Sequence, residues 1–122
     1  MNTKPITIVL AALLWAAAAS PSMAITYTTL DDPLAGPSGT VPHGISGGNI
    51  VGLFYDSSNI NHGFLYNGST YTTLDDPLAM NGTGAFGVSG GNIVGYYADS
   101  LDVRHGFLYN RCGNALQSIG AD

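Results

Sequence analysis

The chain has little charge, few basic residues and a single cysteine. Only 9% of its 122 residues are charged, and its eight acidic residues are all Asp. Three basic residues, Lys4, Arg104 and Arg111, cannot neutralise a run of phosphates, so we expect neither nucleic acid nor an anionic membrane surface as a partner. Cys112 has no second cysteine to pair with in the chain, so stability is expected from packing or assembly. An intermolecular bridge and an incidental thiol both stay open for Cys112.

Long hydrophobic runs are lacking apart from one near the N-terminus. Residues 6–19 are apolar and follow Lys4, and residues 22–24 (Ser-Met-Ala) place small residues at −3 and −1 of a cleavage site. This pattern predicts a signal peptide over residues 1–24. The alternative, an uncleaved anchor, calls for a longer run, because a bilayer span takes about 20 residues. We therefore expect a secreted chain, extracellular or periplasmic, that starts at Ile25 and has no membrane span. Two Arg against eight Asp then leave it a net charge of −6.

Three sequence words occur twice in the remaining chain. YTTLDDPLA stands at 27–35 and 71–79, GISGGNIVG at 44–52 returns as GVSGGNIVG at 87–95, and HGFLYN stands at 62–67 and 105–110. A fixed period of this kind is the signature of a repeat architecture. We predict a two-repeat domain over residues 25–110, with repeats of about 43 residues at approximately 27–70 and 71–113. Residues 111–122 are expected to be a degenerate or frayed tail.

Within one repeat, turn chemistry separates four short β-strands. Frequent glycine and β-branched or aromatic residues disfavour helix. The predicted strands are residues 41–46, 50–55, 62–66 and 70–74. Between and after them lie a glycine-pair hairpin at 47–49, an Asp-Ser-Ser-Asn turn at 56–59, a two-residue Asn67-Gly68 hairpin and an Asp-Asp-Pro stop at 75–77. The predicted fold class is therefore all-β: two four-stranded antiparallel β-meander repeats that form β-propeller-like blades, with a β-solenoid as the alternative.

The repeated words also resemble a known family. HGFLY, preceded by GNIVG and an Asp-containing turn, resembles the HAF-type extracellular repeat of bacteria in a His-Gly-Phe variant. The resemblance covers residues 27–110 and implies a secreted bacterial protein of several short β repeats, and it brings no catalytic residues with it. We expect structural roles for the repeated residues, namely Gly48, Asn49, His62, Gly63 and Phe64 with their counterparts Gly91, Asn92, His105, Gly106 and Phe107.

Two blades do not close a propeller, which normally takes four or more. After residue 24 the chain begins with YTTLDD lacking its HGFLY, and its last HGFLYN lacks a following YTTLDD. We predict that the N-terminal strand completes the last blade of the same chain or of a neighbour, within a homo-oligomeric ring of two or three chains. Two alternatives stay open: residues 116–119 form a degenerate fourth strand, or residues 111–122 mark a truncated repeat array.

His62 and His105 are the best catalytic candidates by residue type. Catalysis by His needs a base partner or a nucleophile within hydrogen-bond reach, and the chain has no Gly-x-Ser-x-Gly elbow and no Cys paired with His. A hydrogen bond from blade to blade recurs in every copy, whereas an active site is normally single. We interpret both His as structural, and His43, replaced by Phe86 in the second repeat, as a tolerated position. No catalytic or cofactor-binding residue is predicted.

Calcium is the one cofactor that the acidic residues bring into question. Asp56, Asp99 and Asp102 are weak candidate ligands, because neither turn matches the Asp-x-[Asp/Asn]-x-[Asp/Asn]-Gly loop of known calcium sites. The pairs at 31–32 and 75–76 read more simply as strand-ending turns in which Asp caps backbone N–H groups.

Function is expected to be non-catalytic. The abundant Tyr residues would suit a glycan or surface polymer as partner, and a secreted binding or structural module explains why nearly all polar words occur twice. A hydrolase or lyase built on a propeller, and a fragment of a longer repeat protein, are the alternatives.

Overall fold

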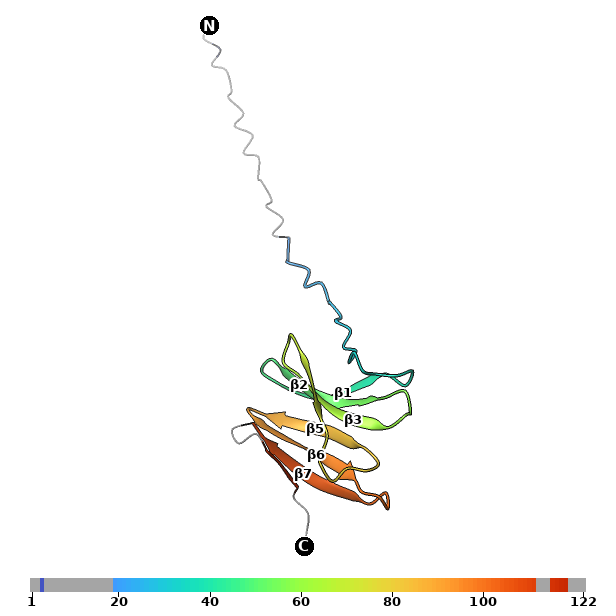
Figure 1. The fold of residues 1–122 in the computed structure, drawn as a ribbon. Helices are drawn as coiled ribbons and strands as arrows, with labels where there is room; N and C mark the ends of the chain where they lie inside the picture. The colour runs from blue at the N-terminus through green and yellow to red at the C-terminus, as the bar shows by residue number, and fades with distance from the viewer. Residues whose placement is uncertain (1–2, 4–18, 112–114, 119–122) are drawn as a thin grey trace.

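The chain folds into two antiparallel β-sheets that stack face to face (Figure 1). The computed structural model describes residue 3, residues 19–111 and residues 115–118. Within this part there is no helix, and eight strands follow one another in sequence: β1 (Thr40–Ser46), β2 (Asn49–Tyr55), β3 (Asn61–Tyr66), β4 (Tyr71–Leu74), β5 (Thr83–Ser89), β6 (Asn92–Ala98), β7 (Arg104–Asn110) and β8 (Ala115–Ser118). The sheets have the strand orders β1-β2-β3-β4 and β5-β6-β7-β8. The prediction of an all-β fold with antiparallel meanders is confirmed.

Several expectations fall outside this description. Most of the predicted signal peptide, Cys112 and Ile119 lie beyond the described residues. Residues 19–30 carry no helix or strand and run away from the first sheet in Figure 1. Among the described residues, no helix is long and apolar enough to cross a bilayer.

Turn chemistry explains where the strands stop: in the first repeat each strand ends at the predicted residue and begins one residue away from the predicted one. Gly47 (φ 59°) and Gly90 (φ 57°) supply the left-handed conformation that the β1–β2 and β5–β6 hairpins need. The Asn67-Gly68 prediction is wrong in one respect. Tyr66 pairs directly with Tyr71, so the β3–β4 connection has four residues, and the Asn67 side chain accepts hydrogen bonds from the backbone N–H groups of residues 69 and 70. This side-chain acceptor stabilises the longer loop.

Glycine and phenylalanine of the repeated words lie opposite each other in the sheets. Gly52 of β2 pairs with Phe64 of β3, and Gly95 of β6 pairs with Phe107 of β7. The ring covers the glycine so closely that a Cβ atom on Gly52 would lie 2.8 Å from Phe64 Cε1. Both rings are almost fully buried. The words GNIVG and HGF are thus halves of one packing unit, because the ring takes the space that a side chain on the glycine would need.

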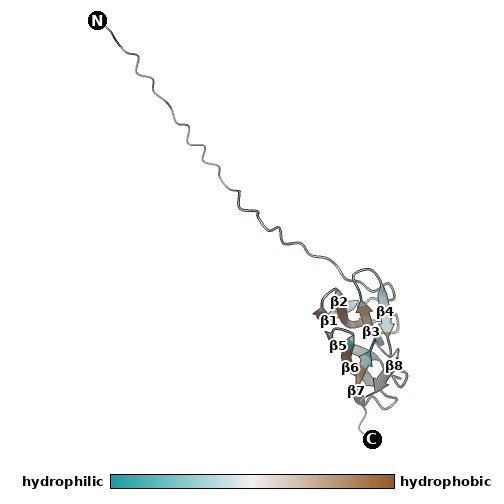
Figure 2. Ribbon diagram, turned by 90° about the vertical axis from the view of Figure 1, so that its left-hand side faces the viewer, coloured by the Kyte–Doolittle hydropathy of each residue, from teal (hydrophilic) through white to brown (hydrophobic). Residues whose placement is uncertain are grey.

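Each sheet has two different faces, because successive residues of a strand alternate between them. We call one the valine face, with Val51, Leu53 and Leu65 in the first sheet and Val94, Tyr96 and Leu108 at the corresponding positions of the second. The other is the phenylalanine face, with Ile50, Phe54 and Phe64 in the first sheet and Ile93, Tyr97 and Phe107 in the second. The apolar residues of both faces are concentrated on the central strands, as the brown segments of Figure 2 indicate.

The core lies where the valine face of the first sheet meets the phenylalanine face of the second. Six buried residues form this core, three from each sheet: Val51, Leu65, Leu74, Ala85, Ile93 and Phe107. Strand β5 connects the two sheets, because it is paired with β6 and also packs against β1, β2 and β3. The phenylalanine face of the first sheet and the valine face of the second therefore have no sheet against them in the described chain.

His43 reinforces this junction, which corrects its interpretation as a tolerated position. A β-bulge between Pro42 and Gly44 turns the residue out of the ladder. Its Nδ1 lies 3.0 Å from the backbone oxygen of Ala85, and its ring stacks on Phe86 with centroids 4.2 Å apart. Phe86 occupies the equivalent bulge of the second sheet. The two residues that differ between the repeats at this position thus contact each other.

Strand β8 shows that the C-terminal tail contributes a fourth strand. It pairs with β7 in the register that β4 has with β3, so residues 116–118 take the places of residues 71–73. Of the alternatives open from the sequence, the structure has the degenerate fourth strand. The N-terminal word instead carries no strand over residues 27–30, and Tyr27 is 93% exposed.

Candidate functional site

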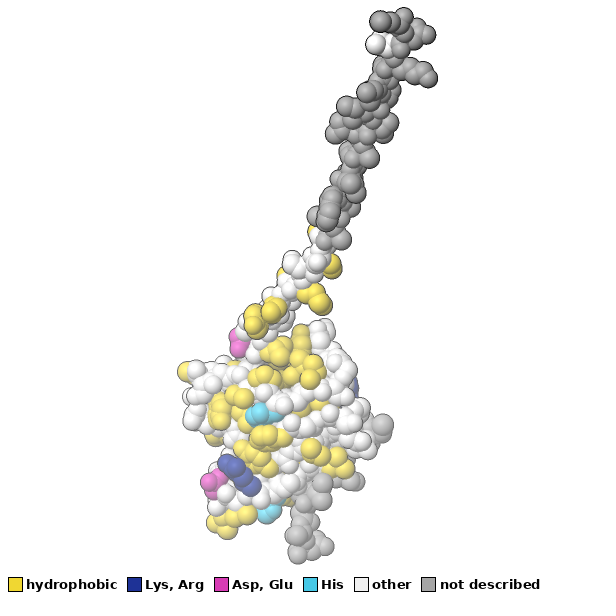
Figure 3. Space-filling model, turned by 180° about the vertical axis from the view of Figure 1, so that it is seen from behind, with side chains coloured by type: hydrophobic (Ala, Val, Ile, Leu, Met, Phe, Trp, Pro, Cys, Tyr) yellow, Lys and Arg dark blue, Asp and Glu magenta, His cyan; other side chains and the backbone are white. Residues whose placement is uncertain are grey.

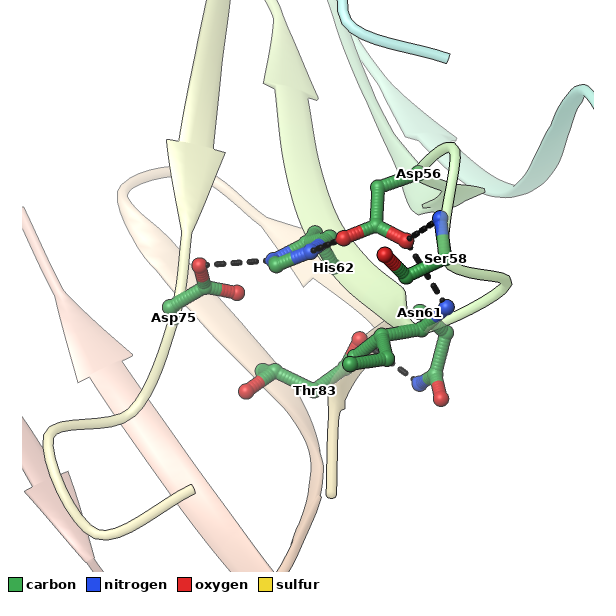
Figure 4. A network of polar contacts seen from close by, with 7 residues as sticks. Asp56, Ser58, Asn61, His62, Asp75 and Thr83 are labelled. Carbon is green, nitrogen blue, oxygen red and sulfur yellow. Dashed lines mark hydrogen bonds and ion pairs between the residues drawn. The ribbon is translucent and has the colours of Figure 1, made fainter. Parts of the chain in front are cut away.

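An Asp–His pair closes the β2–β3 hairpin of the first sheet (Figure 4). Asp56 follows β2, and His62 is the second residue of β3. The Nε2 atom of His62 lies 3.2 Å from Asp56 Oδ2, and its Nδ1 atom lies 2.8 Å from Asp75 Oδ2, just beyond β4. The imidazole therefore lies between two carboxylates contributed by its own sheet, and its ring also stacks on Phe54.

The loop after β2 is arranged around the other oxygen of Asp56. Oδ1 accepts hydrogen bonds from the backbone N–H groups of Ser58 (2.8 Å) and Ile60 (2.9 Å), and Asn59 adopts the left-handed conformation with φ 62°. Short polar residues adopt this conformation more readily than most. One carboxylate thus fixes both the loop backbone and the imidazole.

The second repeat has the same arrangement with one carboxylate fewer. Asp99 Oδ1 accepts from the backbone N–H groups of residues 101 and 103, and Asp99 Oδ2 lies 3.0 Å from His105 Nε2. Asp102 takes the left-handed conformation with φ 61°. The position corresponding to Asp75 is Gly120 in the sequence, which carries no carboxylate. The side-chain hydrogen bonds of His62 and His105 each stay within one sheet, so the expectation of a bond from blade to blade is wrong for both.

These contacts shift the acid–base equilibria. Burial alone would lower the pKa of His62, but its hydrogen bonds to Asp75 and Asp56 outweigh that effect and raise the pKa. The pKa of Asp56 is lowered, first by the N–H of Ile60 and then by His62. The pKa of Asp99 is lowered, first by His105 and then by the N–H groups of Val103 and Leu101. The pairs therefore favour the charged forms of these groups.

Two hollows flank His62. One, of about 320 Å³, is lined by Phe54, Thr73 and Asp75 among others and opens on the phenylalanine face of the first sheet. The second, of about 180 Å³, is lined by Ile60, Met80 and Thr83 among others near the junction of the sheets. Both nitrogens of His62 are engaged with carboxylates, so the ring has no free nitrogen with which to take a proton from a substrate.

The candidate calcium ligands Asp56, Asp99 and Asp102 belong to the loops that the Asp–His pairs close. The carboxylate oxygens of Asp56 and Asp99 bind loop N–H groups and imidazole, and Asp102 lies in the turn that Asp99 closes. Among the described residues, no group of three or more His, Cys, Asp or Glu side chains is placed to hold a metal ion. The glycines at 48 and 91 and the asparagines at 49 and 92 lie at the ends of hairpins, and Gly63 and Gly106 follow the His in β3 and β7.

The Asp-Asp-Pro turns carry a feature that the sequence did not reveal. Asp32 and Asp76 are each at least 96% buried, and Oδ1 of each caps the backbone N–H two residues later, as predicted. The Oδ2 atom of each has no hydrogen-bond partner in the described part of the chain. A buried carboxylate oxygen without a partner is costly, and here it recurs in both copies of the turn.

The Asp–His pairing was also missed, although a signal existed. His62 follows Asp56 by six positions, and His105 follows Asp99 by the same six. A fixed separation across a predicted hairpin places the two side chains near each other.

Comparison of the chain with protein-family models, with curated proteins and with solved structures finds no match in any of the three.

Proposed function

We propose that the chain is a secreted, non-catalytic structural and binding module made of two β-propeller-like blades of the HAF type. The observation that supports this most directly is that the repeated polar residues form hydrogen bonds with one another and with the loop backbone. Asp56 and His62, like Asp99 and His105, bind each other and the loop backbone. Groups held in this way preserve the shape of a hairpin, and at His62 they leave no ring nitrogen free to take a proton from a substrate.

The blade assignment rests on how the sheets stack. A four-stranded meander that packs one face on the next meander is the unit of a propeller, and the 43-residue period suits it. Secretion rests on the signal-peptide pattern of residues 1–24. N-terminal sequencing of the exported protein tests it, and we expect the mature chain to begin at Ile25.

The test of the non-catalytic role compares the wild-type protein with His62→Asn. Chromogenic esters, glycosides and uronic-acid polymers are incubated with each, and we expect hydrolysis or β-elimination at the rate of the buffer alone. Turnover that His62→Asn abolishes in a folded protein would establish the hydrolase or lyase alternative. A glycan array tests the binding part of the proposal, which predicts that Tyr27 and Phe86, the exposed aromatic residues in the described chain, contribute to any signal.

A further inference from the structure

The internal repeat gives the molecule two free faces that correspond to the two faces already joined. Inside the chain, the valine face of the first sheet packs on the phenylalanine face of the second. No sheet packs on the phenylalanine face of the first sheet, although Phe54 and Phe64 on it are at most 2% exposed, and none packs on the valine face of the second. Because the two repeats are alike in sequence, the phenylalanine face of the first sheet corresponds to the buried one of the second, and the valine face of the second to the buried one of the first. A second molecule can therefore pack on the first as the two sheets pack within one chain.

Exposure of equivalent residues supports this relation. Val51 is fully buried in the junction, whereas its counterpart Val94 is 47% exposed. Val88 packs against the core, whereas its counterpart Ile45 is 70% exposed. Val94 thus has a fully buried equivalent in the other repeat, and Ile45 has a partly buried one. Figure 3, which views the two-sheet body from behind, shows apolar side chains in patches among polar side chains and backbone.

The phenylalanine face of the first sheet has two hollows that side chains of a partner could fill. A hollow of about 270 Å³ is lined by Leu30, Pro42, Ile45 and Ile50 among others, and the 320 Å³ hollow beside Phe54 lies on the same face. In the joined sheets, the corresponding face is covered by Val51, Leu53 and Leu65. The residues that would enter the hollows are thus their counterparts on the second sheet, Val94, Tyr96 and Leu108.

We infer that a second copy of this chain docks head to tail, with the phenylalanine face of its first sheet against the valine face of the second sheet. Such a contact is heterologous and closes into a ring when the rotation between copies permits. Phe86 of one copy then stacks on His43 of the next, which is the pair already present within the chain with the roles exchanged. This inference goes beyond the proposed function, and since Tyr27 and Phe86 lie in the contact between copies, glycan binding through them would be a property of undocked chains.

The N-terminal word fits the same arrangement. Its Asp32 turn has the hydrogen bonds of the Asp76 turn, including the one from the Asp backbone N–H to a threonine hydroxyl, but residues 27–30 before it lack a sheet to join. Because residues 71–74, which precede the Asp76 turn, pair with β3, the corresponding residues 27–30 of the docked copy would lie along the edge of β7 that β8 occupies. In the docked state, residues 27–30 of one copy therefore replace β8 of the other at this edge. Tyr27 then contacts Tyr109 as Tyr71 contacts Tyr66 within the chain.

Light scattering on the purified protein during size-exclusion chromatography tests the docking. We expect a mass of two or three chains. Val94→Asp and Ile45→Asp each place a charge on one free face and should each give a monomer, while Leu101→Asp, an equally charged change on an 81% exposed loop residue, should not. Tyr27→Asp, on a 93% exposed residue, should weaken assembly without lowering monomer stability.

Mixing the two monomeric variants separates head-to-tail docking from a face-to-face dimer. Each retains one intact face, so an equimolar mixture should form a complex of two chains. A mixture that stays monomeric, or a wild-type protein that is monomeric at its highest soluble concentration, would overturn the inference. Circular dichroism of each variant shows that it is folded, and the wild-type mass gives an answer even where a variant is not.

Discussion

Replacing Gly52 with Ala tests the packing of a phenylalanine ring over a glycine, on which each sheet depends. A Cβ atom at this position would overlap the backbone oxygen of Val41 and would lie 2.7 Å from Pro42 Cα and 2.8 Å from Phe64 Cε1. Two of these three atoms belong to the backbone of the neighbouring strand β1. The new methyl group therefore has to displace β1 as well as the buried Phe64 ring.

The expected cost is about 3 kcal/mol, the upper end for over-packing, because backbone rather than a flexible side-chain end must move. Gly48→Ala is the matched control. Gly48 lies in the hairpin without a left-handed φ, and the nearest atom to its added Cβ would be Asn67 O at 3.9 Å. Both variants reduce the freedom of the unfolded chain equally, so their difference isolates the close contact.

Thermal unfolding followed by circular dichroism measures the difference. At about 4–8 °C per kcal/mol for a domain of this size, Gly52→Ala should unfold roughly 12–24 °C below Gly48→Ala. Urea unfolding with an unchanged slope would show that the native state and not the unfolded chain is affected. A Gly52→Ala protein that unfolds within about 3 °C of the control would refute the close packing of ring on glycine.

Three further perturbations address the loop site and the junction. The raised pKa of His62 means that its contribution to stability is present below about pH 6.5 and is lost as the pH rises through the folded-state value. The unfolding temperature should therefore fall from about pH 6 to about pH 9, and His62→Asn should flatten that dependence. His43→Ala removes the Phe86 stack and the bond to Ala85 and should cost about 2 kcal/mol in urea unfolding, of which His43→Phe restores the ring part. Asn61→Ala removes a 2.9 Å bond to the backbone oxygen of Thr83 and should cost about 1 kcal/mol by the same measurement.

Local chemistry was enough to predict the strands, because glycine pairs, Asn-Gly and Asp-Asp-Pro limit where a ladder can continue. It was also enough to predict the caps made by Asp32 and Asp76. The order of strands within each sheet followed from short connections, which place sequential strands side by side. These are properties of residues close together in sequence, and strands β1, β2 and β3 of the first repeat recur as β5, β6 and β7 in the second.

Contacts between distant residues could not be predicted in this way. The contact of His43 with Phe86, a residue 43 positions away, depends on a bulge that turns the His43 side chain toward it. The sequence carries no strong signal for that bulge. Whether residues 115–118 form β8 likewise depends on their pairing with the edge of β7, although their sequence differs from that of β4. Which face of each sheet becomes buried depends on how the two sheets stack, and both faces of β2 are apolar in the sequence.

The position of β5 between the sheets has a consequence for how the protein folds. Since β5 completes one sheet and covers the other, the core between the sheets belongs to neither repeat alone, and each repeat supplies half of it. Stability in such arrays is a sum of repeat terms and nearest-neighbour interface terms, with the interface favourable and the isolated repeat weak. The two repeats should therefore melt in a single transition, and each copy added by duplication would gain one full interface for one further repeat. Selection can thus lengthen or shorten such an array by whole repeats without building a new core.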